Sequence, residues 1–334
     1  MTRVAVVGVG SMGRNHVRVY NEIPDAELVA VVDSNPTTAE SLGRQYRIPA
    51  YHDFHTMLEK EHPEAVSVVV PTSEHFTIAK QILEAGCHVL VEKPIAATLE
   101  DAEELICIAD KLDRILMVGH IERFNPAIIE LKRRLNAGEL GQIFQIYARR
   151  LGPFPTRISD VGVVMDLAPH DLDIMRYLTG SEVIQIYAQT KHQLRTSQDD
   201  LFVGMINFKD DTLGLLEINW LTPTKIRELY VTGERGMFRA NYLTQDLFFY
   251  ENAEANSGNW PALSLLRGVS EGVVNQFAIH KKEPLHGELA AFIACVQGNR
   301  AQQVNGRDAQ AALKLTMALI ESATTGKVKG INPP

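Results

Sequence analysis

One lysine stands where its side chain could take part in chemistry. Lys93 follows the apolar run 89–91 and Glu92, and it directly precedes Pro94. A strand that ends in a lysine and then meets a proline, which cannot continue the hydrogen-bond ladder, projects an amine from the carboxyl edge of a sheet. Ligands bind at that edge in open α/β sheets. Lys93 is therefore a candidate to contact a substrate, and a solvated surface lysine is the simpler alternative.

A second candidate group consists of one histidine and two carboxylates. Asp166, His170 and Asp173 are spaced by four and three residues, so on a helix their side chains share one face. Pro169 removes one helical hydrogen bond there and leaves the carbonyl of Met165 without its usual donor, a local cost that functional sites tolerate. A capped structural histidine is the alternative interpretation.

A glycine-rich segment near the amino terminus has the pattern of a dinucleotide-binding loop. It follows the β-branched run 4–7 and opens a helical stretch that continues to Tyr20. Glycines at these spacings permit a tight turn, close approach of the backbone to a pyrophosphate, and close packing of helix on strand. The residues expected to contact the cofactor here are Gly8, Gly10, Ser11, Met12 and Gly13.

The next expected strand, 28–32, ends in a carboxylate that indicates which dinucleotide is bound. Asp33 lies 20 residues after Gly13, the spacing of an acid that holds the adenosine ribose hydroxyls. Ser34 follows, where enzymes that use the phosphorylated cofactor often have an arginine, and the carboxylate would repel a 2′-phosphate. Asp33 and Ser34 therefore predict NAD rather than NADP.

The elements that position these residues indicate an α/β protein with two domains. Strands alternate with helices up to about residue 120, which predicts a parallel Rossmann sheet in a domain spanning 1–121. After a linking helix at 126–135, strand-like runs separated by short turns predict a large, mostly antiparallel open sheet with helices on one face, in an α+β domain spanning 122–334. The expected strands are 143–149, 183–189, 201–208, 213–220, 228–231, 237–242 and 247–250, and the expected helices are 163–178, 289–297 and 309–324.

Composition limits the classes of partner. The net charge of −8 argues against a nucleic-acid surface, and the few, distant cysteines indicate neither a disulfide framework nor a metal site. A strand begins within a few residues of Met1 and no apolar run approaches membrane-spanning length, so we expect a cytoplasmic protein that does not engage a membrane. The uncovered face of the second sheet predicts self-association, as a homodimer or homotetramer.

Four motifs together resemble the Gfo/Idh/MocA family of sugar and polyol dehydrogenases, over essentially the full length. They are the glycine loop with Asp33, the segment 71–75, Glu92-Lys93-Pro94, and Asp166-x-x-x-His170-x-x-Asp173. The resemblance implies a nicotinamide over the edge of the Rossmann sheet and a cis Lys93–Pro94 bond. It also implies that Lys93 and His170 flank the reacting hydroxyl, and that Thr72, His75 and Glu92 line the cofactor.

The implied chemistry suits these residue types. Oxidation of a secondary alcohol requires a proton acceptor for the hydroxyl while a hydride leaves for the nicotinamide. His170 is the expected general base, Asp166 would orient its imidazole, and Lys93 would stabilise the developing alkoxide. The sequence leaves open which of Lys93 and His170 accepts the proton.

Three further segments, 119–126, 152–155 and 219–225, resemble the family branch that acts on UDP-N-acetylhexosamines, especially the UDP-N-acetylglucosamine 3-dehydrogenases. Arg157 with one of Arg149 and Arg150, which point to opposite faces of a strand, and with Lys225 would clamp the diphosphate. Phe154 or Trp220 would pack on the uracil. The predicted substrate-binding residues are His120, Arg123, Asn125, Arg157, Asp173, Trp220 and Lys225.

Two other functions remain open from the sequence. A dehydrogenase of a free polyol, such as an inositol 2-dehydrogenase, would need no anion-binding group. A non-catalytic NAD-sensing regulator would be expected to lack the lysine or the histidine, and both are present.

Overall fold

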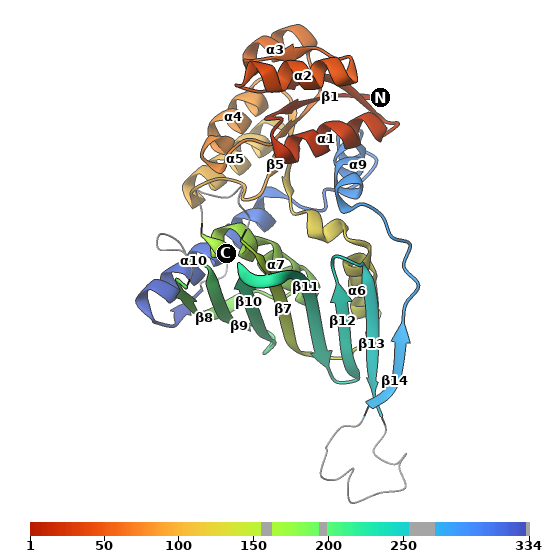
Figure 1. Cartoon of the computed structure of the whole chain (residues 1–334), viewed down its shortest axis with the longest axis vertical. Helices are drawn as coiled ribbons and strands as arrows, with labels where there is room; N and C mark the ends of the chain where they lie inside the picture. Colours follow the sequence, from red (N-terminus) through yellow and green to blue (C-terminus); the bar gives the residue numbers. More distant parts are fainter. Residues whose placement is uncertain (155–161, 194–198, 254–270, 332–334) are drawn as a thin grey trace, which may run out of the picture. The chain divides into compact units, whose positions relative to one another are not determined.

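The computed structural model describes residues 1–154, 162–193, 199–253 and 271–331, and its contacts divide the chain into two units (Figure 1). The first unit comprises Met1–Phe124 and Lys282–Lys314, and the second comprises Asn125–Lys281 and Leu315–Pro334. The sequence-based division placed residues 282–314 in the second domain, whereas here they return to the first unit. The reason is that helix α9 (Pro284–Val296) packs against α1 (Ser11–Glu22), with an ion pair between Arg18 and Glu283.

The first unit contains the predicted parallel Rossmann sheet, with strand order β3-β2-β1-β4-β5-β6. Its central strands are buried along nearly their whole length because helices lie on both faces, which explains their continuous apolar runs. The strands are β1 (Thr2–Val7), β2 (Ala26–Val32), β3 (Ala50–Tyr51), β4 (Ala65–Val68), β5 (His88–Glu92) and β6 (Leu116–Gly119). The remaining helices are α2 (Pro36–Tyr46), α3 (Phe54–Glu61), α4 (Thr72–Glu84), α5 (Leu99–Leu112) and the 3-10 helix η1 (Ile121–Phe124).

The order of strands places one switch point at the middle of this sheet. β1 pairs in parallel with β2 on one side and with β4 on the other, so the helices that follow β1 and β4 leave in opposite directions. Because all six strands run the same way, the loops after β1, β2, β4 and β5 open on one edge. That edge at a switch point is where open α/β sheets bind ligands.

The second unit contains the predicted open sheet, with nine strands in the order β14-β13-β12-β11-β7-β10-β9-β8-β15. Among the described strands of this second sheet, only β10 and β7 pair in parallel. The strands are β7 (Ile143–Pro153), β8 (Val183–Lys191), β9 (Leu201–Phe208), β10 (Leu213–Asn219), β11 (Leu221–Gly233), β12 (Gly236–Asn241), β13 (Asp246–Asn252), β14 (Glu271–Gln276) and β15 (Lys329–Gly330). The helices are α6 (Pro126–Asn136), α7 (Val163–Thr179) and α10 (Gly306–Thr325), whose second half belongs to this unit.

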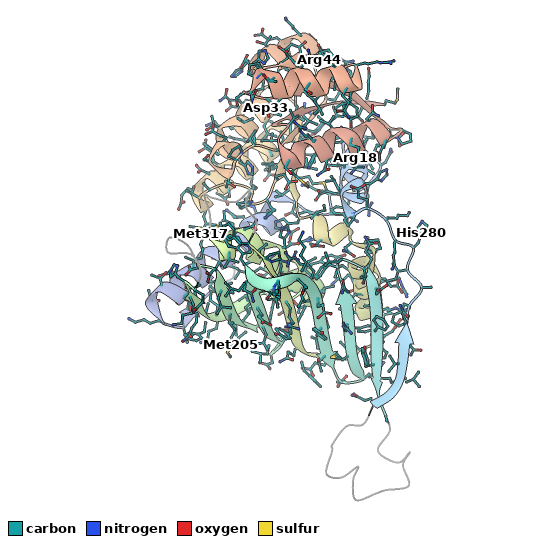
Figure 2. All side chains as sticks on the ribbon, viewed as in Figure 1. Arg18, Asp33, Arg44, Met205, His280 and Met317 are labelled. Atoms are coloured by element: carbon teal, nitrogen blue, oxygen red, sulfur yellow. The ribbon has the colours of Figure 1, made fainter. Side chains whose placement is uncertain are left out.

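The two faces of this sheet differ in burial. On β9, Phe202 and Ile206 are fully buried in the core that α6, α7 and α10 complete. Val203 and Met205 alternate with them on the opposite face, where 49% and 46% of their surfaces are exposed. Met205 is labelled in Figure 2. Phe144 on β7 is exposed to a similar extent. The described residues of one copy therefore leave exposed apolar side chains on this sheet face.

Within the described ranges, no helix combines the length and the apolar character needed to cross a bilayer.

Candidate active site

The glycine loop after β1 has the backbone that a dinucleotide requires. Gly8 has φ +87°, and a Cβ there would overlap the backbone of Val69. A Cβ at Gly13 would overlap the carbonyl oxygen of Gly8, so only glycine lets α1 pack this close to the turn. At Gly10 a Cβ would point into open space, on the side where a pyrophosphate would approach the first amides of α1, at Ser11.

Asp33 is held in place by two backbone amides. Its Oδ2 accepts a hydrogen bond from Val9 N at 2.9 Å, and its Oδ1 accepts one from Asn35 N at 2.9 Å. These bonds join the end of β2 to the glycine loop, and Ser34 beside them is exposed. The loop and this carboxylate fit NAD, which supplies the hydride acceptor when bound.

Lys93 directly follows β5 at the same sheet edge. The Lys93–Pro94 peptide bond is cis, as the family resemblance implied. The backbone N–H of Lys93 donates to Glu92 Oε2 at 3.3 Å, so the acid curls back beneath the lysine.

Glu92 also belongs to a buried pair that the sequence did not reveal. Its Oε1 lies 3.0 Å from Nε2 of His16, a fully buried residue of α1. Burial acts to raise the pKa of Glu92, but the hydrogen bond to His16 and the charges of His16 and Lys93 outweigh it, so this pKa lies below its ordinary value. Glu92 therefore stays a carboxylate next to Lys93. The only signal in the sequence was a histidine on the inner face of the helix after the glycine loop.

A second acid, Glu288 on α9, lies in the interior of the same unit. Its side chain is 0% exposed, and neither oxygen has a hydrogen-bond partner among the described residues. Burial, followed by the charges of Glu92 and Glu122, holds the pKa of Glu288 well above its ordinary value of 4.5. Glu288 therefore binds its proton more tightly than Glu92 does, because the pKa of Glu288 is raised and that of Glu92 is lowered. Its sequence position, about 200 residues after Glu92, gave no hint of this proximity.

The cofactor-lining residues predicted after β4 have different surroundings. Thr72 begins α4 and is partly exposed. His75 is buried, with Nδ1 2.8 Å from the carbonyl oxygen of Pro94 and Nε2 3.0 Å from that of Val70. Burial lowers the pKa of His75, although both carbonyls favour the protonated ring. His75 therefore joins the loop after β4 to the loop after β5, which shapes the sheet edge around Lys93.

In the second unit, α7 carries the histidine and acids as predicted. The helix begins at Val163 and includes Pro169. Asp166 and His170 are partly exposed, whereas Asp173, on the next turn, is buried. The helix thus carries an imidazole and a carboxylate one turn apart.

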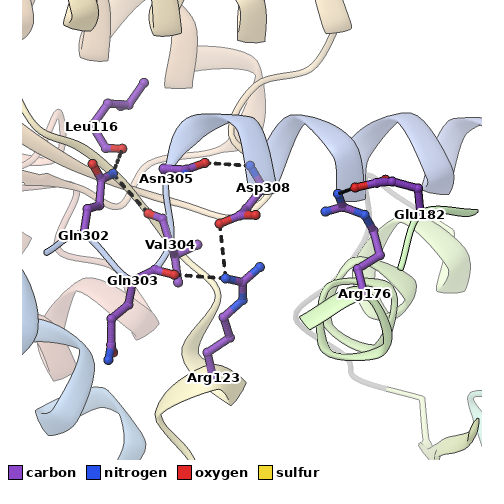
Figure 3. Close-up of polar contacts among 9 residues, drawn as sticks. All are labelled: Leu116, Arg123, Arg176, Glu182, Gln302, Gln303, Val304, Asn305 and Asp308. Carbon is purple, nitrogen blue, oxygen red and sulfur yellow. Dashed lines mark hydrogen bonds and ion pairs between the residues drawn. The ribbon is translucent and has the colours of Figure 1, made fainter. Parts of the chain in front are cut away.

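Three predicted substrate-binding residues lie inside the protein. The Nη1 of Arg123 donates to the carbonyl oxygen of Gln303 at 2.9 Å and to Asp308 at 3.1 Å, which ties η1 to the start of α10 (Figure 3). Asn125 caps α6 through Ala127 N and donates from Nδ2 to the carbonyl oxygen of Tyr242 at 3.0 Å. His120 is also buried. Arg123 and Asn125 thus have partners within the protein, and their part in substrate binding stays a prediction.

The aromatic residues and the lysine predicted to hold a nucleotide differ in how far they are buried. Trp220 is buried in the core with its ring edge-on to Phe154, so packing explains it, and Phe154 is the more exposed partner. Lys225 is exposed beside the end of β7, where its Cγ would lie 3.5 Å from a Cβ built at Gly152. Arg157 lies outside the described residues.

The two strand arginines correct one prediction. Arg149 points to the open face and donates to Glu217 at 3.0 Å, whereas Arg150 is buried in an ion pair with Asp171. Because each guanidinium is committed to a carboxylate of its own unit, neither belongs in the diphosphate clamp. Alternation on β7 required that one arginine face the interior, and an acid on α7 occupies it there.

No group of three or more histidine, cysteine or acidic side chains in the described part of the chain is arranged to hold a metal ion.

Replacement of Asp33 tests the cofactor assignment. The wild-type protein should bind NAD more tightly than NADP, and Asp33→Ala should erode that preference, because the variant loses both the ribose contact and the repulsion of a 2′-phosphate. Fluorescence titration with NADH and NADPH measures both affinities. Equal or tighter binding of NADPH by the unmodified protein would contradict the assignment.

Replacement of Glu288 by Gln tests the buried acid. Because the pKa of Glu288 is raised on folding, the folded protein binds this proton more tightly, and the stability it contributes is lost as pH rises above about 4.5 toward the raised pKa. Urea unfolding should therefore show that wild type loses stability relative to Glu288→Gln between pH 5 and pH 9.

The exposed Glu59→Gln variant serves as the control and should follow wild type at every pH. A constant difference between Glu288→Gln and wild type across this range would mean that Glu288 does not titrate there.

Comparison with known proteins agrees with this geometry. Residues 2–120 match the family model described as an oxidoreductase family with an NAD-binding Rossmann fold, and residues 128–239 match the Gfo/Idh/MocA C-terminal domain. A UDP-N-acetylglucosamine 3-dehydrogenase of Acidithiobacillus ferrooxidans is 30% identical over 95% of this chain and 97% of its own. A crystal form of that enzyme superimposes with a TM-score of 0.85 at 27% identity, covering 97% of this chain and 98% of the other.

Two other relatives have different substrates in their names. A D-glucoside 3-dehydrogenase of Escherichia coli is 34% identical over 97% of this chain and 96% of its own. A scyllo-inositol 2-dehydrogenase of Bacillus subtilis is 27% identical over 97% and 94%, respectively. With a matching family model for each half and relatives of at least 30% identity along nearly the whole chain, this protein belongs to the Gfo/Idh/MocA oxidoreductase family and is an NAD-dependent dehydrogenase.

Proposed function

We propose that the protein oxidises a secondary hydroxyl of a sugar with NAD, and that its substrate is UDP-N-acetylglucosamine, oxidised at C3 to the 3-keto sugar. The observation that carries this proposal is the similarity to the Acidithiobacillus ferrooxidans enzyme along almost the entire length of both chains. The Escherichia coli relative, named for the same position of oxidation on a glucoside, also supports chemistry at C3.

In this proposal two side chains act on the reacting hydroxyl. His170, oriented by Asp166, accepts the hydroxyl proton, and the Lys93 ammonium stabilises the oxygen as negative charge develops. The hydrogen on the same carbon leaves as a hydride for the nicotinamide, and the carbonyl remains. The carboxylate of Glu92, whose pKa lies below its ordinary value, is the residue next to Lys93 in the chain.

An uncharged sugar is the second candidate substrate. Arg149 and Arg150 each pair with a carboxylate, so the strand cation predicted for a diphosphate clamp is already paired, which favours a simple glucoside. Relatives named as inositol dehydrogenases support a free polyol in the same way.

The test is to follow NADH absorbance with UDP-N-acetylglucosamine, a methyl D-glucoside and myo-inositol offered separately. We expect the nucleotide sugar to give the highest kcat/KM, and His170→Asn or Lys93→Met to reduce turnover by roughly 10² or more, because each removes a group that acts at the transition state. NAD affinity and melting temperature should stay close to wild type. Activity on glucoside or inositol without activity on the nucleotide sugar would reject the substrate, and near-normal turnover of either variant would reject its role.

The diphosphate site is proposed to contain Arg157 and Lys225. Loss of a charge-assisted bond to phosphate should cost about 1.5–3 kcal/mol of transition-state stabilisation for Arg157→Ala with the nucleotide sugar, and added salt should shrink the difference. Lys225→Ala should act in the same direction by a smaller amount, since its ammonium is exposed. Lys209→Ala, an exposed lysine elsewhere in this unit, is the control. An unchanged kcat/KM for Arg157→Ala would remove it from the site.

We also propose that the open sheet face joins two copies of the chain. Val203, Met205 and Phe144 supply exposed apolar surface there, and Tyr147 and Arg149 already pair with Glu217 among them. Sedimentation should show that Met205→Glu shifts the protein to a smaller species, because the interface would bury an unpaired charge. Ile129→Glu, at an exposed apolar position on α6, should leave the assembly unchanged, and a monomeric wild type would contradict the proposal.

A further inference from the structure

A buried ion pair connects the sheet to the helix that carries His170. Arg150, on β7, donates from Nε to Asp171 Oδ2 at 2.7 Å and from Nη2 to Oδ1 at 2.9 Å. Arg150 is 4% exposed and Asp171 is 1% exposed, so water does not compete for these bonds. Two parallel bonds between a planar guanidinium and a carboxylate fix both the distance and the orientation of the partners.

The ion pair contacts the helix at the residue next to His170. Asp171 immediately follows His170 in α7, and Pro169 immediately precedes it. Proline has no N–H to donate to the previous turn, so the helix is less constrained by its own bonds at this point than elsewhere. A contact from outside the helix, made at Asp171, can therefore set the rotation of this helical turn. The rotation of the turn in turn sets the direction of the His170 imidazole.

The other end of the contact is rigid. β7 lies inside the sheet, where Arg150 is in register with Ile218 of β10 and with Arg227 of β11. The guanidinium carbon also lies 5.3 Å from the centre of the Tyr242 ring. The carbonyl of Tyr242 in turn accepts the bond from Asn125, which caps α6. The backbone of Arg150 is thus fixed within the sheet, and its guanidinium lies near an aromatic ring as well as bonding to Asp171.

Neither of two simpler roles explains this pair. A ligand anion would have to displace Asp171 from a site that is closed to solvent. Net stabilisation of the fold is a weak explanation, because apolar residues of similar volume often replace a buried ion pair without loss of stability. What apolar residues cannot supply is the two-bond geometry.

We propose that Arg150 is a positioning residue for His170, which acts through Asp171 by fixing the orientation of the helical turn between them. This inference rests on the proposed role of His170 as proton acceptor. A base displaced by about 1 Å from its productive position can cost on the order of 10²-fold in rate.

The decisive variant is the double replacement Arg150→Met with Asp171→Leu, which removes the ion pair without leaving a buried charge. We expect a cooperative melt close to that of wild type, unchanged affinity for NAD, and a kcat lower by on the order of 10²-fold with a smaller change in KM. In the less stable Arg150→Ala variant, millimolar methylguanidinium should restore part of kcat by binding Asp171. Arg149→Met is the matched control, because it removes the neighbouring arginine on the opposite face of the same strand, and it should leave kcat unchanged.

Each outcome distinguishes this inference from the proposed function. If His170→Asn lowers turnover but the folded double variant keeps kcat within about threefold of wild type, the positioning role is wrong and the function stands. If His170→Asn itself keeps normal turnover, the proposed function fails first. If the double variant loses its cooperative melt, or Arg149→Met lowers kcat as much as the double variant does, the pair is structural and the inference is overturned.

Discussion

Parallel pairing of the strands around β1 is the constraint on which the cofactor site depends. Because the strands run in one direction, their carboxyl ends meet at one edge, where Gly8, Asp33 and Lys93 follow three different strands. The bond from Val9 N to Asp33 joins two of these loops, and the absence of a Cβ at Gly13 lets α1 approach the turn. The geometry that faces a dinucleotide is therefore a result of backbone packing, and side chains add the choice between NAD and NADP.

The charge near Lys93 at this edge of the sheet depends on two buried acidic residues, Glu92 and Glu288. Two carboxyl groups, those of Glu92 and Glu288, lie in the interior of the same unit, where burial, followed by the charge of Glu92, raises the pKa of Glu288. His16 hydrogen-bonds to Glu92, whose pKa is lowered, so that a carboxylate lies next to Lys93. In the second unit a different device serves His170, whose helix is fastened to the sheet through Asp171 and Arg150. The two groups of the proposed chemistry thus differ in their support, since a carboxylate lies next to Lys93 and a buried ion pair lies next to His170.

The local part of this arrangement could be predicted from the sequence. Strand and helix periodicity, the spacing from Gly13 to Asp33 and the helical face of Asp166 and His170 each depend on residues close together in the chain, and the structure contains the same elements. The cis bond at Lys93 followed from the family resemblance, which no local rule would supply.

The remainder depends on contacts between distant segments. His16 and Glu92 are 76 residues apart, and α9 with Glu288 returns to the first unit from the far end of the chain. The alternation of side chains along a strand showed that only one of Arg149 and Arg150 faces inward. It could not show that Asp171 lies within bonding distance of the inward arginine. Arg123, Asn125 and Trp220 were predicted to bind substrate from their side chains alone, and their contacts with Asp308, with the first turn of α6 and with the core come from the fold.

The most direct test of the account follows the hydride itself. UDP-N-acetylglucosamine carrying deuterium at C3 would be incubated with the protein and NAD, and the reduced cofactor and the sugar examined by mass spectrometry and NMR. We expect the deuterium to appear on the nicotinamide ring while the sugar becomes the 3-keto product, and we expect His170→Asn to abolish the transfer. Two results would contradict the proposed oxidation at C3. One is reduced cofactor without deuterium from the C3-labelled sugar, and the other is deuterated cofactor only from sugar labelled at another carbon.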